Sequence, residues 1–119
     1  CAAKVVGGVP QKVSATYKLP VSKVQGVLGL ANGQLALSTS YGNNKSRIYR
    51  LKPGGSATSM LTGPPGFEDL ARTPDGLVWT MSESGATYFQ KRGSNGKCSS
   101  PWTGLYPYIF VFKASDVGG

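Results

Sequence analysis

The chain has 119 residues and a formal net charge of +8, with 17 Gly and 8 Pro spread along its length. This length suits a single domain over residues 1–119. Because Gly and Pro break helix interiors and alternate here with Val, Thr, Ser and aromatic residues, we predict an all-β fold. The chain has no histidine, which excludes the commonest general base and every Ser-His or Cys-His nucleophile within it.

The two cysteines, Cys1 and Cys98, are too few for a zinc site of the four-ligand cysteine type. We expect a disulfide between them that would hold the N-terminus, and with it a secreted protein. Two alternatives stay open for Cys1: a lipid anchor and an N-terminal nucleophile. No apolar run approaches the roughly 20 residues of a membrane-spanning helix, so we expect no such segment.

The first of two repeat units is expected over residues 13–55. An outer strand over 13–19 precedes an apolar strand over 24–28, and the hairpin signal Asn32-Gly33 leads into a strand over 34–40. A third strand is predicted over 47–52, where polar and apolar residues alternate.

The second unit is expected over residues 56–116, because the same order of features returns 43 residues later. An outer strand over 56–61 precedes segment 67–71, and Asp75-Gly76 is the matching hairpin signal. Strands over 77–83 and 108–113 follow. The long loop at 90–104 between them contains Cys98 and Trp102 and is the best candidate for a functional loop.

A repeat of this length is typical of β-propeller blades, which are small antiparallel sheets that pack on one another. Two blades cannot close a ring of four to eight. We therefore expect either missing blades supplied in trans by a longer protein, or a homo-oligomer. The alternative is a single β-sandwich or barrel that contains two ordinary β-meanders.

Three segments carry a resemblance to a known family: Lys23-Val24-Gln25-Gly26-Val27, Leu37-Ser38-Thr39-Ser40-Tyr41-Gly42 and Gly66-Phe67-Glu68-Asp69-Leu70. In this order they resemble a family of secreted β-propeller-like proteins of unassigned function from actinobacteria and fungi. The resemblance covers roughly residues 20 to 114 and implies secretion and a propeller-like fold. More loosely, Pro74-Asp75-Gly76-Leu77-Val78-Trp79 is similar to hairpins of gluconolactonase-like propellers.

Five carboxylates are available for a metal or acid-base site: Glu68, Asp69, Asp75, Glu83 and Asp116. Glu68 and Asp69 open the strand that would line a propeller channel, where Gln25 takes the equivalent place in the first unit. Adjacent strand residues point to opposite faces, so only one of the pair can face a given site. Glu68 or Asp69 therefore either makes structural hydrogen bonds or ion pairs, or is one ligand of a calcium site that Glu83 could reach.

Asp75 is expected to be a turn residue. Trp79, Phe110 and Phe112 are expected in the core, and Trp102 is a candidate platform for sugar stacking or a lid. Asn44-Lys45-Ser46 matches an N-glycosylation acceptor at Asn44.

All of the net positive charge belongs to the first 66 residues, which contain eight basic residues and no acidic one. Such a surface attracts polyanions in a salt-dependent way. Lys45, Arg47, Arg50 and Lys52 cluster in sequence, near Tyr41 and Tyr49. Residues 47 and 50 have opposite parity on one strand, however, so we expect the cluster to be split between two faces.

No set of residues identifies a catalytic activity, and two hypotheses of function follow. The first is a secreted, non-catalytic binding module for a carbohydrate or another polar or anionic ligand, which needs no cofactor. Candidate ligand-binding residues are Gln25, Glu68, Asp69, Glu83 and Trp102. The second is a piece of a metal-dependent, lactonase-like hydrolytic propeller in which Glu68 or Asp69 supplies one metal ligand.

Overall fold

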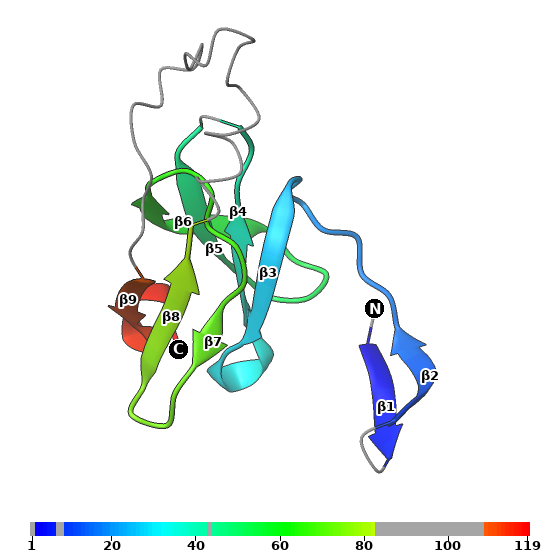
Figure 1. Ribbon diagram of the computed structural model, residues 1–119. Coiled ribbons are helices and arrows are strands. Elements are labelled where there is room, and N and C mark those ends of the chain that lie inside the picture. Colours follow the sequence, from blue (N-terminus) through cyan, green and yellow to red (C-terminus); the bar gives the residue numbers. More distant parts are fainter. Residues whose placement is uncertain (1, 7–8, 43, 83–108) are drawn as a thin grey trace, which may run out of the picture.

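The computed structural model describes residues 2–6, 9–42, 44–82 and 109–119, and for residues 2–14 it describes the backbone only. This part of the chain is all-β, as predicted. It contains two multi-stranded antiparallel sheets, a separate two-stranded hairpin and two short 3-10 turns (Figure 1). Within the described ranges, no helix is long and apolar enough to cross a membrane.

The first sheet is a four-stranded meander in which each strand pairs with the next one along the chain. Its strands are β3 (Val24–Gly29), β4 (Leu35–Thr39), β5 (Ser46–Leu51) and β6 (Ala57–Gly63). The expected Asn-Gly turn connects β3 to β4: Asn32 and Gly33 both have positive φ, 60° and 68°, and Leu30 N donates to Gln34 O at 2.7 Å. The strands predicted over 34–40 and 47–52 are thereby confirmed as β4 and β5.

The second sheet has three strands, β7 (Ala71–Arg72), β8 (Leu77–Met81) and β9 (Ile109–Lys113). Asp75 is in the turn between β7 and β8, as predicted. Its Oδ1 accepts hydrogen bonds from Thr73 Oγ1 and from Leu77 N, and these bonds hold the pKa of Asp75 below its usual value. Gly76 follows with a φ of 83°, a conformation that glycine adopts at little cost.

Two predicted outer strands are wrong. The segment over 13–19 does not join the first sheet: β2 (Val9–Ala15) pairs with β1 (Ala2–Val6) in the separate hairpin. The segment over 56–61 belongs to the first sheet, as part of β6, and not to a second unit that begins at residue 56. A tight turn after β5, in which Gly55 N donates to Lys52 O at 2.8 Å, returns the chain directly alongside β5.

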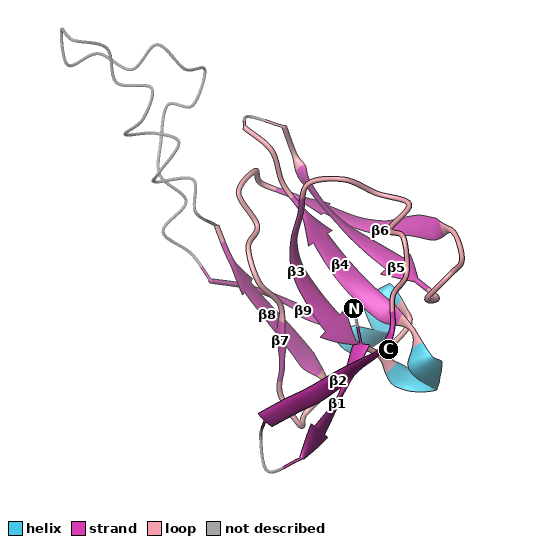
Figure 2. Cartoon of the chain, turned by 90° about the vertical axis from the view of Figure 1, so that its right-hand side faces the viewer, coloured by secondary structure: helices cyan, strands magenta, loops and turns pink. Residues whose placement is uncertain are grey.

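The two sheets lie against each other (Figure 2), and their inner faces share one hydrophobic core. Its buried members come from both sheets, from their connections and from the final 3-10 turn η2 (Ala114–Val117): Leu30, Ala36, Ile48, Phe67, Leu70, Val78, Ala114 and Val117. In the described part neither sheet closes into a barrel. Two open sheets that share a core are compatible with a pair of blades and with a sandwich, so the propeller stays a prediction.

The side chains of β8 and β9 alternate between this core and the outer face of the second sheet. Phe110 and Phe112 pack against the core, as predicted, and Val78 is fully buried. The prediction for Trp79 is wrong: its side chain is on the outer face and is 36% exposed. Its Nε1 donates to Thr73 Oγ1 at 3.0 Å. Side chains alternate between the two faces of a strand, and Val78 and Thr80 take the core-facing positions of β8, so Trp79 points outward.

Candidate functional site

A cationic hollow lies on the outer face of the first sheet, at the end where β4 stops and β5 begins. It has a volume of about 200 Å³ and is open to solvent. Three cations line it, Lys23, Lys45 and Arg47, together with two aromatic rings, Tyr41 and Tyr49. The rest of its described lining consists of polar residues: Ser22, Thr39, Ser40 and Asn44.

The register of β4 and β5 places the strand residues of the hollow. Thr39 is opposite Arg47 across the sheet, and Thr39 Oγ1 donates to Arg47 O at 3.5 Å. Tyr49 is two residues beyond Arg47, so both side chains are on the same face of β5. Between the strands, Asn44 N donates to Tyr41 O at 3.1 Å, and this turn holds Tyr41 and Lys45 at the rim.

Lys23 reaches the hollow from the start of β3 through an unusual backbone. Its φ is 60°, in the left-handed region that a residue with a Cβ seldom adopts. Its carbonyl accepts a hydrogen bond from Ser40 N at 3.1 Å. Its ammonium is 4.3 Å from the ring centroid of Tyr41, which is a cation–π distance. The cation is therefore held above an aromatic ring that is itself 62% exposed.

The positive charge of the hollow is not balanced locally, because no carboxylate is among the described residues that line it. The expected splitting of the basic cluster is confirmed. Arg47 lines the hollow, whereas the Arg50 side chain packs beside Gly118 on the opposite face of the sheet. Lys52 does not line it. Lys23, which is distant in sequence from the basic cluster, lines the hollow beside Lys45 and Arg47.

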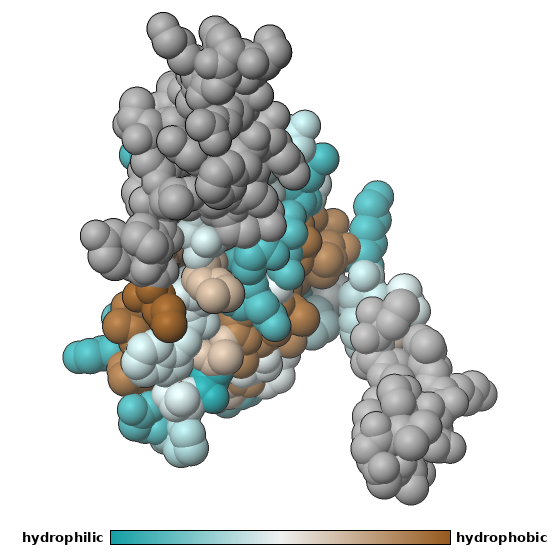
Figure 3. Space-filling model, viewed as in Figure 1, coloured by the Kyte–Doolittle hydropathy of each residue, from teal (hydrophilic) through white to brown (hydrophobic). Residues whose placement is uncertain are grey.

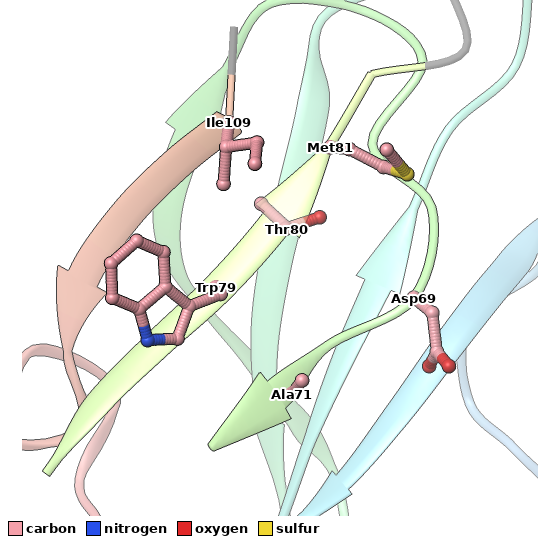
Figure 4. A pocket seen from close by; sticks show the side chains of 6 residues that line it. All are labelled: Asp69, Ala71, Trp79, Thr80, Met81 and Ile109. Atoms are coloured by element: carbon pink, nitrogen blue, oxygen red, sulfur yellow. The ribbon is translucent and has the colours of Figure 1, made fainter. Parts of the chain in front are cut away.

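Glu68 and Asp69 are not part of this hollow. Oε1 of Glu68 is buried. Asp69 is exposed and lines a different hollow on the outer face of the second sheet (Figure 4), where its Oδ1 accepts a hydrogen bond from Leu70 N at 2.9 Å. Among the residues that the structure describes, no group of three or more His, Cys, Asp or Glu side chains could hold a metal ion.

The other predicted site residues are distributed as follows. Gln25 is exposed and does not line the hollow, and its Nε2 donates to Ser40 O at 3.4 Å. Asn44 is exposed, but Ser46 of the same acceptor sequence is fully buried, and glycosylation stays a prediction. Cys1, Glu83, Cys98 and Trp102 lie outside the described residues, as does the loop at 90–104.

Comparison of the chain with known protein families, curated proteins and solved structures finds no match. Membership of a propeller-like family therefore stays a prediction.

The three segments that carry the family resemblance meet in one structural joint between the two sheets. Ser40 Oγ accepts a hydrogen bond from Gly66 N at 3.0 Å, and Ser38 Oγ donates to Glu68 O at 2.5 Å. A Cβ on Gly26 would lie 2.7 Å from Asp69 Cα, so only a glycine allows this approach. These contacts give the segments a structural role, joining the first sheet to the chain that enters the second.

Sequence reasoning missed this joint, although a signal for it exists. Ser38 and Ser40 share a face with Ala36 of the core and are nevertheless buried. Ser46 of β5 completes the set, since its Oγ accepts a hydrogen bond from Phe67 N at 2.9 Å. Serines at alternate positions on a core-facing strand require buried partners, and the backbone of residues 66–68 supplies them.

Proposed function

We propose that this chain is a non-catalytic binding module for an anionic, polar ligand, with acidic carbohydrates as the first candidates. The observation that carries the proposal is the cationic hollow, where Lys23, Lys45 and Arg47 surround one open space with no carboxylate among its described lining. Concentrated charge of one sign attracts the opposite charge and raises its local concentration.

The other side chains of the hollow favour a carbohydrate over a simple ion. The exposed ring of Tyr41 offers a flat apolar surface for a sugar ring. The hydroxyl groups of Ser22 and Thr39 and the amide of Asn44 can exchange hydrogen bonds with sugar hydroxyl groups. An acidic sugar would use both kinds of contact, whereas a neutral sugar would leave the cations unused.

The hydrolytic alternative has less support in the described residues. It requires a metal site built on Glu68 or Asp69, and these two side chains lie in different surroundings, one with a buried oxygen and one exposed. The remaining ligands of such a metal ion would have to come from outside the described residues. Secretion, which would bring the module into contact with extracellular glycans, stays part of the proposal.

Isothermal titration calorimetry with acidic oligosaccharides and their neutral counterparts tests the proposal. The double variant Lys45→Ala/Arg47→Ala should weaken binding of the acidic ligand by at least about tenfold, or about 1.4 kcal/mol. The matched control, Lys52→Ala/Arg72→Ala, removes the same charge from exposed positions that do not line the hollow, and it should have a much smaller effect.

Two results would contradict the proposal. Equal weakening by both double variants would show that total charge, and not the hollow, attracts the ligand. Equal affinity for acidic and neutral oligosaccharides would show that the cations are not used. Raising the salt concentration should weaken binding to the unmodified chain, because screening reduces exposed charge interactions.

A further inference from the structure

The outer face of the second sheet carries an exposed apolar patch over β7, β8 and β9. Four large side chains on this face are 36%, 58%, 66% and 50% exposed: Trp79, Met81, Ile109 and Val111. Ala71 lies beside them, and the hollow between these side chains is almost wholly apolar (Figures 3 and 4). A contiguous apolar patch of this kind marks an interaction surface, because soluble proteins seldom leave one uncovered.

The outer face of the first sheet carries a groove of about 430 Å³. Leu37 and Leu51 form its buried floor. Its rim is apolar and accessible, because Tyr17, Leu19 and Val27 are 49%, 42% and 55% exposed. The inner faces of the two sheets share the core, so the groove and the patch face away from each other on opposite sides of the molecule.

The patch and the groove are complementary in three respects. The patch presents protruding apolar side chains and the groove presents an apolar hollow, so one can fill the other. Each is the surface of an antiparallel sheet, and the inner faces of the same two sheets already pack together within the chain. Among the described residues, one charged side chain lines the hollow of the patch, Asp69, and one lines the groove, Lys18.

We propose that the occupant of each surface is a second copy of this chain, with the patch of one copy seated in the groove of the next. The contact is head-to-tail, because the two surfaces differ and both are present on every copy. Such contacts form a closed ring when the rotation between copies closes, and a filament when it does not. With two sheets per chain, a ring of four to eight sheets would take two to four copies.

Sedimentation velocity of the full chain over a wide range of concentrations measures the association, and two variants locate it. Val27→Glu puts a negative charge in the groove, and Ile109→Glu puts one of the same sign in the patch. Each alone should weaken self-association by at least about tenfold, because an unpaired charge is costly in an apolar contact. Thr62→Lys, at an exposed position of β6 that lines neither surface, is the control and should associate normally.

An equimolar mixture of Val27→Glu and Ile109→Glu gives the sharpest result, because the two altered surfaces then repel each other. Each variant keeps one intact surface, so the mixture should form a heterodimer that grows no further, at concentrations where each variant alone is monomeric. Three results would overturn the proposal: a monomer of 12.5 kDa at all concentrations, no heterodimer in the mixture, or full self-association of Val27→Glu alone. The last would indicate patch-to-patch contact, and a persistent monomer would assign these faces to a different partner.

Discussion

Gly26→Ala is expected to destabilise the protein strongly, because Gly26 is at the joint between the two sheets. A Cβ at this position would lie 2.7 Å from Asp69 Cα, 2.9 Å from Glu68 O and 2.9 Å from Ser38 Oγ. Carbon atoms prefer separations of about 3.5–4.0 Å, so the backbone of residues 67–70 would have to move by about 1 Å. Overpacking of this kind costs about 1–3 kcal/mol. Loss of the Ser38–Glu68 hydrogen bond adds about 0.5–1.5 kcal/mol.

We therefore expect Gly26→Ala to lower the free energy of unfolding by about 2–4 kcal/mol. Gly29→Ala is the matched control on the same strand, since a Cβ there would meet no atom within 4 Å. It should be neutral or stabilise by up to about 1 kcal/mol, because Ala restricts the unfolded chain more than Gly does. Urea unfolding followed by tryptophan fluorescence measures both. Indistinguishable midpoints for the two variants would refute the close contact between Gly26 of β3 and the backbone of residues 68–69.

Three further substitutions test buried polar groups and one turn. Ser46→Ala leaves the buried Phe67 N–H without its acceptor and should cost about 1–3 kcal/mol in urea unfolding; an unchanged midpoint would contradict that hydrogen bond. Thr80→Val should stabilise by about 1 kcal/mol, because in the described structure Thr80 Oγ1 is buried without a partner; a loss of stability would reveal a partner. Asp75→Ala should lower the melting temperature at neutral pH. Hydrogen bonds from Thr73 and the backbone lower the folded pKa of Asp75, so its stabilisation is present above the unfolded pKa and is lost as the pH falls through the folded value. The difference from the unmodified chain should vanish in acid, and a difference that persists there would refute a role for the charge.

The strands that the sequence predicts correctly are those connected by turns whose residues, Asn-Gly and Asp-Gly, favour the positive φ that a tight hairpin needs. Asn32-Gly33 lies between β3 and β4, whose bounds were predicted to within one residue, and Asp75-Gly76 precedes β8, whose bounds were predicted to within two. The strand before Asp75-Gly76 was predicted less well, because β7 begins at Ala71 and not at residue 67. The outer strands were wrong because each segment pairs with the strand just before it, β2 with β1 and β6 with β5, and not with a strand that follows it. Residues 57–63 contain no pattern that distinguishes pairing with β5 from pairing in a second unit; the short turn after Lys52 decides it.

The charged site was predictable in part, for a similar reason. Strand parity correctly separated Arg47 from Arg50, because alternation along a strand is a local rule. The contribution of Lys23 could not be predicted, since it depends on a left-handed backbone and on pairing with Ser40, which is 17 residues away. Trp79 could not be placed from its residue type alone. A large aromatic residue in a strand was expected in the core, but the position of Trp79 along β8 puts its side chain on the outer face of the sheet.

The position of the resembling segments also bears on where function should be sought. Ser38, Ser40 and Gly26 are committed to the joint between the sheets, and each has a contact that a substitution would break. A sequence pattern that preserves this joint would preserve the packing of two sheets whatever ligand the protein binds. The groove, the patch and the cationic hollow are all on outer faces, where side chains can change without disturbing the joint. Binding should therefore depend on residues such as Arg47 and Ile109, and on Lys23 and Tyr41 within the resembling segments, whereas Gly26, Ser38 and Ser40 should report on the fold.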